Sequence, residues 1–237
     1  MMRATRPRDD DGFLDGMRTI TPLIVAVLPI GMVFGSVAAT KGLSPLEATL
    51  MSAFVFAGGS QFVAMDIWTD PASWSAVGVA ALLVNIRHVL MSASLGRRLQ
   101  RFSPAARGVA MLFLADEIWA MAEARSRLAP LTVRWFAGLV VPFYAAWVLS
   151  TLLGATLGAF LGDPKAVGLD FAFPAVFVVL VMGFWKDRQT GVVLAASAVA
   201  ALVVQRLVPG VWYIAAGAAA GLVVSAFQTT GEEALAS

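Results

Sequence analysis

Three short polar groups lie inside the apolar stretches of this 237-residue chain, and they are the residues that could do chemistry. They are Gly58-Gly59-Ser60-Gln61, Asn85-Ile86-Arg87-His88 and Asp116-Glu117. An arginine at the centre of a membrane helix costs about 2.5–3.5 kcal/mol on insertion scales. Ionisable residues kept at such a cost are expected to have a partner, contact with water, or a function.

The first group predicts a break in a helix. Two adjacent glycines are poor helix formers, and these lie in the middle of the apolar stretch Leu46–Met65. If a second helix begins there, its unpaired backbone N–H groups and partial positive charge suit a carboxylate. Glycine also admits a ligand close to the backbone, and the two polar residues that follow add side-chain donors. The candidate substrate-binding residues are therefore Gly58, Gly59, Ser60 and Gln61. Alternatively, the two glycines only allow helices to pack closely.

The second group lies deep in the apolar stretch Ala72–Leu95. On a helix Asn85, His88 and Ser92 share one face, so they could line one cavity, and Asn85 is a candidate substrate contact. Arg87 and His88 are candidates for gating or proton coupling, because His88 is the only histidine and histidine titrates near neutral pH. Alternatively, Arg87 extends its guanidinium to a lipid headgroup near the end of the stretch.

The third group is a pair of adjacent carboxylates in the short stretch Gly108–Ala122. Adjacent residues of a helix project about 100° apart, so one could face a cavity while the other meets Arg87 or the membrane interface. Asp116 and Glu117 are therefore candidates for holding a substrate ammonium or carrying a proton, with Asp116 favoured as the inward residue. The alternative is an interfacial helix whose acids are simply exposed to water.

The composition places most of the chain in lipid. Hydrophobic residues make up 59% and charged residues 14%, and the mean hydropathy is +0.80. Soluble domains have about 45–50% apolar and about 25% charged residues, which excludes an ordinary soluble protein and most nucleic-acid binders. The sequence has no cysteine, zinc-binding histidine pair, P-loop, GxSxG motif or dinucleotide fingerprint, so we expect no metal, cofactor or hydrolytic site.

Eight apolar stretches predict an all-α, multi-pass membrane helix bundle. They are Thr19–Thr40, Leu46–Met65, Ala72–Leu95, Gly108–Ala122, Trp135–Leu161, Phe171–Trp185, Thr190–Val204 and Val211–Phe227. We expect a cytoplasmic N-terminal tail at residues 1–18, a transmembrane domain at residues 19–228 and a C-terminal tail at residues 229–237. About six of the stretches would be complete spans.

The distribution of basic residues predicts which stretches do not cross. Eleven of the 17 basic residues lie in the N-terminal tail and in region 97–134, so the positive-inside rule places both on the cytoplasmic side. Three stretches separate them, and an odd number of crossings cannot return the chain to the same side. Leu46–Met65, with its central glycines, is the candidate for a broken or re-entrant helix. The same count applies between Arg107 and Arg188, where Gly108–Ala122 is the candidate for an incompletely inserted or bundle-interior segment.

A weak internal similarity indicates a possible repeat. Gly31-x3-Gly35 precedes Gly42-Leu43-Ser44, as Gly154-x3-Gly158 precedes Gly168-Leu169-Asp170. Transporters are often built from two such repeats. A repeat would place a second helix discontinuity near Phe173-Pro174, because proline removes a backbone donor and disfavours a helical residue before it. The glycine pairs are also small-x3-small patterns, which let helices approach closely.

Taken in order, these motifs resemble the AzlC family, the large subunit of two-component branched-chain amino acid exporters. The resemblance extends from about Gly16 to about Phe227. It is carried by Pro29-x4-Phe34-Gly35, Gly42-Leu43-Ser44, Met51-Ser52-x3-Phe56-Ala57-Gly58-Gly59-Ser60-Gln61-Phe62, Asn85-Ile86-Arg87-His88-x2-Met91, Asp116-Glu117 and Asp170-Phe171-x-Phe173-Pro174. It implies proton-driven export of branched-chain and related amino acids across the cytoplasmic membrane, with a separately encoded, small AzlD-type membrane subunit as partner.

We therefore hypothesise a secondary exporter in which a zwitterionic amino acid binds near the bilayer midplane. Its carboxylate would lie at Gly59-Ser60-Gln61 and its ammonium near Asp116 or Glu117. His88 or one of the acids would carry a proton, and Arg87 would set its pKa or close a gate.

Two other classes of function stay open: a membrane enzyme using His88 with Asp116 or Glu117, and a passive channel or structural subunit. The enzyme would need a nucleophile signature, which the sequence lacks.

Overall fold

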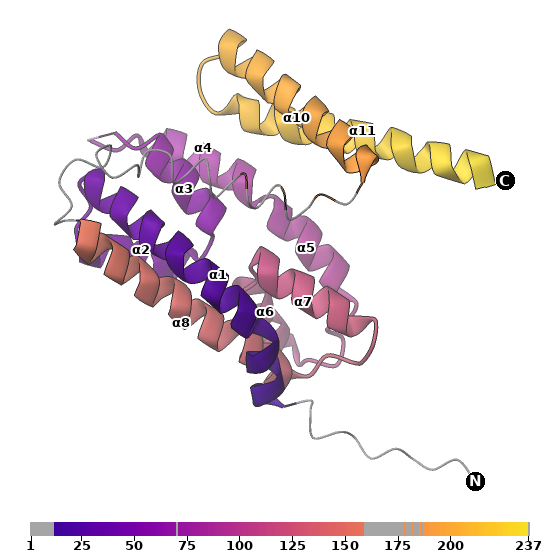
Figure 1. Cartoon of the computed structure of the whole chain (residues 1–237), viewed down its shortest axis with the longest axis horizontal. Helices are drawn as coiled ribbons and strands as arrows, with labels where there is room; N and C mark the ends of the chain where they lie inside the picture. The colour runs from indigo at the N-terminus through magenta and orange to yellow at the C-terminus, as the bar shows by residue number, and fades with distance from the viewer. Residues whose placement is uncertain are drawn as a thin grey trace. The chain divides into compact units, whose positions relative to one another are not determined.

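The computed structural model describes residues 12–69, 71–158, 178, 182, 185 and 187–236, with side chains as far as residue 228. The regular elements in these ranges are all helices (Figure 1). They are α1 (Phe13–Thr40), α2 (Pro45–Val55), α3 (Gly58–Asp66), α4 (Trp74–Asn85), α5 (Arg87–Gly96), α6 (Pro104–Leu112), α7 (Asp116–Ser126), α8 (Val133–Gly158), α10 (Arg188–Leu207) and α11 (Trp212–Ala236). The expected all-α bundle is confirmed. The discontinuity expected near Phe173-Pro174 lies outside the described residues, as does the Gly168-Leu169-Asp170 part of the possible repeat.

Among the described residues, four segments are long and apolar enough to cross a membrane. They are Phe13–Thr40, Trp74–Gly96, Val133–Gly158 and Arg188–Leu207. The second of these is interrupted at Ile86, where α4 ends and α5 begins. The helices α2, α3, α6 and α7 have 9 to 11 residues each, which is too short to span a hydrocarbon core of about 30 Å.

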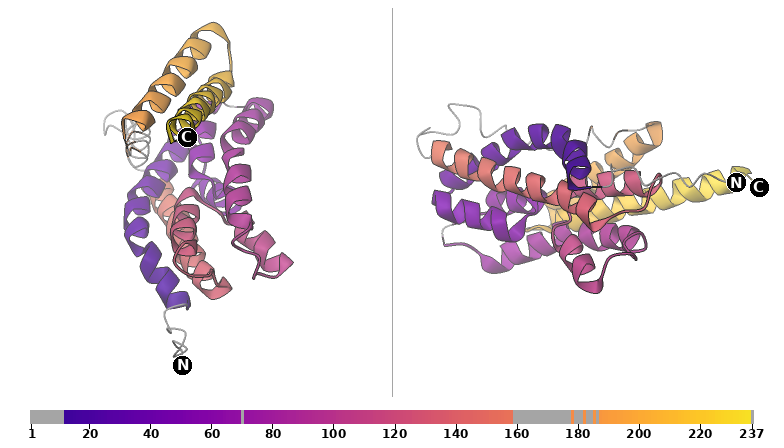
Figure 2. Two further views of the ribbon diagram at one scale, coloured as in Figure 1. Left: turned by 90° about the vertical axis from the view of Figure 1, so that its right-hand side faces the viewer. Right: turned by 90° about the horizontal axis from the view of Figure 1, so that it is seen from below.

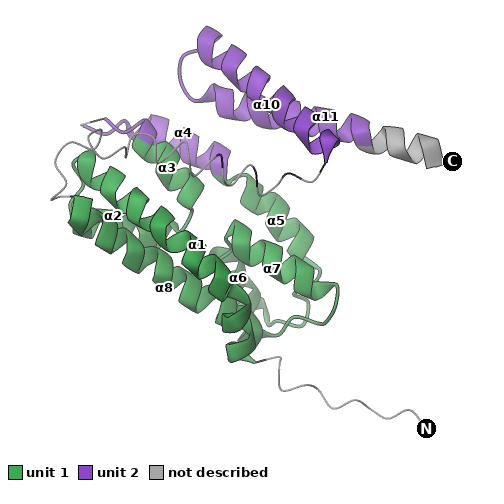
Figure 3. Cartoon of the chain, viewed as in Figure 1, with its two compact units in different colours: residues 1–65, 85–170 green, residues 66–84, 171–237 purple. Residues whose placement is uncertain are grey.

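The chain forms two compact units (Figure 3). Unit 1 comprises residues 1–65 and 85–170 and holds all three polar groups identified in the sequence. Unit 2 comprises residues 66–84 and 171–237. Within unit 2, α10 and α11 pack side by side, and Gly217 and Gly221 of α11 face Ser197 of α10. These two glycines therefore serve helix packing, as the small-x3-small pattern predicts.

Parallel helices α1 and α8 form the core of unit 1 (Figures 1 and 2). Gly16 of α1 lies against Trp135 near the start of α8, and Gly35 lies against Thr151 near its end, so the two helices run in the same direction. A Cβ atom on Gly35 would overlap the backbone oxygen of Thr151, and one on Gly154 would overlap that of Met32. Reciprocal glycines thus bring the two backbones into contact, as small residues do in membrane proteins.

Helices α2 and α3 form a hairpin that does not cross the unit. Ser44 and Glu47 make a capping box, with Pro45 as the first helical residue, and this fixes where α2 begins. The helix ends where Phe56 adopts a left-handed conformation, with φ of 42°. Beyond the turn, Nε2 of Gln61 donates to Oγ of Ser52 at 3.0 Å. Nine residues of continuous helix would separate these two side chains by about 13 Å, so the chain reverses direction. The break expected within Leu46–Met65 is confirmed.

Helices α6 and α7 form a second hairpin. Ser103 caps α6, and Pro104 is its first residue. The ring centroid of Phe102 lies 6.0 Å from that of Phe136, near the start of α8, whereas Phe113 lies 5.4 Å from Tyr144, two turns further along α8. The chain then turns at residues 113–115 and returns through α7. The stretch Gly108–Ala122 is therefore divided between two short helices.

An ion pair ties the returning end of α7 to the start of α1. Nη1 of Arg125 lies 3.0 Å from Oδ2 of Asp15, and the guanidinium stacks 5.1 Å from the ring centroid of Trp135. The N-terminal end of α1 and the basic region 97–134 therefore meet at the same end of unit 1. This is the arrangement that the charge distribution predicts.

The tips of the two hairpins meet halfway along α8. The ring centroids of Phe56 and Phe113 lie 6.2 Å apart, and Tyr144 contacts both rings at 5.1 and 5.4 Å. The hydroxyl of Tyr144 donates to the backbone oxygen of Ala53 at 2.9 Å. Because α2 enters beside the end of α1 and α6 enters beside the start of α8, the hairpins come from opposite ends. Their short helices reach only to the middle of the unit.

Candidate functional site

The centre of the candidate site is an ion pair between Arg87 and Asp116. Nη1 of Arg87 lies 2.8 Å from Oδ2 of Asp116, and the two side chains are 39% and 35% exposed. Asp116 is the first residue of α7, where a carboxylate interacts favourably with the helix dipole, and Ala115 before it supplies no side-chain cap. Arg87 therefore has a partner within the protein. The structure does not show the alternative, in which its guanidinium extends to a lipid headgroup.

Gly59 lies directly beneath the guanidinium of Arg87. A Cβ atom at Gly59 would lie 3.1 Å from Nη2 of Arg87, and one at Gly58 would lie 3.1 Å from the ring of Trp147. Glycine at both positions thus permits close approach by a charged group on one side and a ring on the other. The N-terminus of α3, with its unpaired backbone N–H groups, begins at these two residues beside the ion pair.

Asn85 joins the α3 hairpin to the break between α4 and α5. Its Nδ2 donates to Oγ of the buried Ser60 at 3.3 Å. Within the described chain, Oδ1 of Asn85 and Nε of Arg87 are buried polar atoms without a hydrogen-bond partner. Buried polar atoms are nearly always paired, so two unpaired atoms at one helix break mark a place where a ligand or water would be stabilised.

His88 lies at the same break. Its Nδ1 is 3.2 Å from the backbone oxygen of Asn85, and its side chain is half-buried. The helix is interrupted at Ile86, whose φ of −56° and ψ of −27° stay helical, so Asn85 ends α4 while His88 and Ser92 lie in α5. His88 is held at the helix break, and none of its hydrogen bonds to described residues reaches Asp116 or Glu117.

Glu117 stands next to the ion pair without joining it. Its side chain is half-buried, and it lies within electrostatic range of both Asp116 and Arg87. Among the described residues it has no salt bridge. Of the two adjacent acids, Asp116 is therefore the one that pairs with Arg87.

A buried hydrogen-bond network fixes the α3 hairpin onto α8. Oε1 of Gln61 accepts from Nε1 of Trp147 at 3.1 Å, while its Nε2 donates to Ser52. The hydroxyls of Ser52 and Thr151 lie 2.8 Å apart, and Thr151 donates to the backbone oxygen of Trp147 at 2.9 Å. Gln61, Ser52 and Thr151 are fully buried. Both ends of the Gln61 amide are therefore engaged in holding the hairpin.

Comparison with known proteins identifies the family of this chain. Residues 22–161 match the family model described as AzlC protein. The chain belongs to the AzlC family. It is 32% identical to the inner membrane protein YgaZ of Escherichia coli over 193 residues, which cover 78% of each chain.

Other relatives match over similar lengths. An uncharacterized membrane protein of Archaeoglobus fulgidus is 30% identical over 79% of this chain and 83% of its own. The branched-chain amino acid transport protein AzlC of Bacillus subtilis is 23% identical over 71% of this chain and 66% of its own. No solved structure matches the chain. Family membership gives this protein a role in transport at a membrane.

The matched region of this AzlC family member contains all the candidate residues found from the sequence. The structure brings Gly59, Arg87 and Asp116 together and links Asn85 to Ser60. Sequence reasoning did not find the role of Trp147 and Thr151. A tryptophan one turn before a serine and a threonine in an apolar helix was the available signal, since each polar group there needs a partner.

Proposed function

We propose that this protein exports branched-chain and related neutral amino acids across the cytoplasmic membrane, coupled to protons, together with a small AzlD-type subunit. The observation that carries the proposal is the Arg87–Asp116 pair at the meeting point of two opposed hairpins, beside the N-terminus of α3. A charged pair and a helix terminus in one place can bind both ends of a zwitterion. The name of the Bacillus subtilis relative supports the choice of branched-chain substrates.

The carboxylate of the substrate would bind between Arg87 and the backbone N–H groups of Gly58 and Gly59. Arg87 already lies against Gly59, so a carboxylate entering there would compete with Asp116 for the guanidinium. Ser60 and Gln61 then act as part of the same binding region: Ser60 through its hydroxyl and Gln61 by holding the turn against Trp147. Asn85 would use its unpaired Oδ1 as an acceptor.

The ammonium of the substrate would bind to the acids at the start of α7. When Arg87 turns to the substrate carboxylate, Asp116 loses its cation and becomes a partner for the ammonium. Glu117, which has no ion pair among the described residues, would carry the coupled proton, with His88 as the second candidate carrier. Binding of the substrate and of the proton would then both depend on whether the Arg87–Asp116 pair is closed.

The apolar side chain of the substrate would face the aromatic residues at the hairpin tips. Phe56, Phe113 and Tyr144 lie within 6.2 Å of one another, measured between ring centroids. Their rings offer apolar surface next to the charged pair, as a branched aliphatic side chain requires. Opening would separate the two tips, and each tip belongs to a hairpin that reaches a different end of unit 1.

Flux in proteoliposomes tests the proposal. The chain would be reconstituted with its small partner and loaded with labelled leucine or valine, and efflux would be measured with and without an imposed pH gradient. We expect efflux to be faster with the gradient and to be lost in Asp116→Asn. Glu47→Gln removes an exposed charge at the start of α2 while glutamine keeps the capping box, so it is the matched control and should keep normal flux.

Each result separates one part of the proposal. Equal flux with and without the gradient would exclude proton coupling. Normal flux in Asp116→Asn would remove this residue from the mechanism. Efflux that is normal without the small subunit would show that this chain works alone.

A further inference from the structure

A cavity of about 640 Å³ lies between α5 and α7, at the end of unit 1 where Asp15 meets Arg125. This volume is within the range of small-molecule sites, about 300–1,000 Å³. Its lining includes Ser94, Arg97, Arg98, Trp119, Glu123 and Arg127. The cavity is distinct from the Arg87–Asp116 pair, because Trp119 is one helical turn and Glu123 two turns beyond Asp116.

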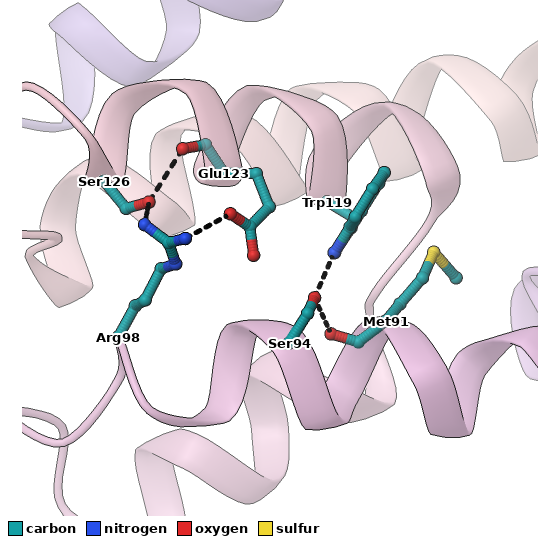
Figure 4. Close-up of polar contacts among 6 residues, drawn as sticks. All are labelled: Met91, Ser94, Arg98, Trp119, Glu123 and Ser126. Carbon is teal, nitrogen blue, oxygen red and sulfur yellow. Dashed lines mark hydrogen bonds and ion pairs between the residues drawn. The ribbon is translucent and has the colours of Figure 1, made fainter. Parts of the chain in front are cut away.

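Hydrogen bonds fix one wall of this cavity (Figure 4). Nη2 of Arg98 lies 3.0 Å from Oε2 of Glu123, and its Nη1 donates to Oγ of Ser126 at 2.6 Å. Ser126 in turn donates to the backbone oxygen of Glu123 at 2.7 Å. Both terminal nitrogens of Arg98 are therefore engaged, and its charge is balanced by a carboxylate that is only 12% exposed.

The second wall carries a tryptophan that is held in place. Nε1 of Trp119 donates to Oγ of Ser94 at 2.8 Å, and Ser94 donates to the backbone oxygen of Met91 at 3.0 Å. With its N–H engaged in this way, Trp119 offers the cavity mainly the apolar part of its ring. Amphipathic rings of this kind are typical of the membrane interface.

Two arginines in the cavity have no partner in the described chain. Arg97 and Arg127 are exposed, and neither makes a hydrogen bond or ion pair with any described residue. Since Arg98 and Glu123 neutralise each other, the cavity carries a net charge of about +2 from these two guanidiniums. A ligand that satisfies them must be an anion with several acceptor oxygens.

We propose that this cavity binds the phosphate group of an anionic phospholipid. A neutral amino acid fits less well, because its ammonium would need a carboxylate and Glu123 is already paired with Arg98. The apolar span Trp74–Gly96 ends one residue before Arg97, which places the two free arginines at the level of lipid headgroups. Beside Arg127, the side chain of Leu128 is 89% exposed and provides apolar surface for an acyl chain.

The proposal is independent of the transported substrate. The ligand chemistry is a phosphate ester, and two sources could supply it: a lipid headgroup or a phosphate compound in solution. Lipids satisfy both the arginines and the apolar surface beside them. A soluble phosphate satisfies only the arginines.

Binding to the purified full chain tests the assignment. Retention of phosphatidylglycerol and of phosphatidylcholine would be measured by native mass spectrometry of the protein released from detergent micelles. Soluble glycerol 1-phosphate and leucine would be added in separate arms. The variants are the double change Arg97→Gln with Arg127→Gln, the double change of both to lysine, and Arg101→Gln as a matched control, since Arg101 is exposed and does not line the cavity.

We expect the protein to retain phosphatidylglycerol in preference to phosphatidylcholine. The double glutamine variant should bind it about thirtyfold more weakly, because each arginine near an anionic lipid contributes about 1 kcal/mol. The double lysine variant should keep most of the binding, and Arg101→Gln should bind normally. Equal loss in Arg101→Gln, or no loss in the double glutamine variant, would overturn the proposal. Displacement of the lipid by glycerol 1-phosphate would assign the site to a soluble phosphate instead, and displacement by leucine would assign it to substrate.

Discussion

Nη1 of Arg87 lies 2.8 Å from Oδ2 of Asp116, and this pair connects the helix break between α4 and α5 to the tip of the α6–α7 hairpin. Neither residue is in the interior of a regular helix: Arg87 begins α5 and Asp116 begins α7. Backbone at a helix break has unpaired polar groups, which membranes tolerate only where protein or a water-filled cavity surrounds them. The ion pair thus stands where the fold already departs from regular helices.

A double-mutant cycle on Arg87 and Asp116 measures this relationship. Arg87→Gln and Asp116→Asn should each lower the free energy of unfolding, and the double variant should lose less than the sum of the two. Both side chains are more than a third exposed, so we expect a coupling of only about 0.5–1 kcal/mol. Unfolding in detergent followed by circular dichroism provides the measurement. Strict additivity would show that the pair is not formed.

Gly59→Val should impair transport more than it impairs folding. A side chain at this position meets the end of the Arg87 side chain, which is flexible and can move, so the backbone need not shift. Displacing Arg87 would separate it from Asp116 and block the approach of a carboxylate to α3. Leucine efflux from proteoliposomes should therefore fall while the unfolding temperature changes little.

Gly78→Val is the control for this prediction. Gly78 lies in α4, and a Cβ there would have no described atom within 4 Å. It should leave efflux unchanged. If Gly59→Val keeps normal efflux, the space above Gly59 is not used by the substrate.

Gly154→Ala should destabilise unit 1 strongly. The added Cβ would overlap the backbone of Met32, which cannot move without separating α1 from α8. Overpacking of this kind costs about 1–3 kcal/mol.

Gly108→Ala is the contrasting variant. Gly108 lies inside α6, and a Cβ added there would have no described atom within 4 Å. Alanine should therefore stabilise α6 by up to about 1 kcal/mol. Unfolding temperatures of the two variants that shift by the same amount would contradict the close packing of α1 on α8.

The sequence predicts the first hairpin well but not the position of its turn. Charge counting and the glycine pair indicate that Leu46–Met65 does not span, and the structure agrees. The turn itself is at Phe56, two residues before Gly58, in a left-handed conformation that favours glycine. The rings of Phe113, in the turn after α6, and of Tyr144 in α8 pack against Phe56, so tertiary contacts hold this conformation.

Other features of the site depend on contacts that no local pattern encodes. The break at Ile86 has neither glycine nor proline to announce it. The 100° between Asp116 and Glu117 shows that only one acid can face Arg87, but which one does so depends on how α7 is rotated. The partners of Gln61 come from residues 9 and 86 positions away, Ser52 and Trp147.

Trp147→Phe should loosen the α3 hairpin without removing the apolar ring. Phenylalanine keeps much of the stacking on Phe34, whose ring centroid lies 6.1 Å away, but it cannot donate to Gln61. Oε1 of Gln61 is then a buried acceptor without a partner, which costs about 1–3 kcal/mol.

Adding Gln61→Leu to Trp147→Phe removes the unpaired acceptor but also the donor to Ser52, so it should recover only part of this loss. Hydrogen exchange of α3 amides checks the effect: exchange should accelerate in Trp147→Phe and slow again in part in the double variant. Unchanged exchange in Trp147→Phe would show that the network does not hold the hairpin, and Gln61 would again be a candidate for direct contact with the substrate.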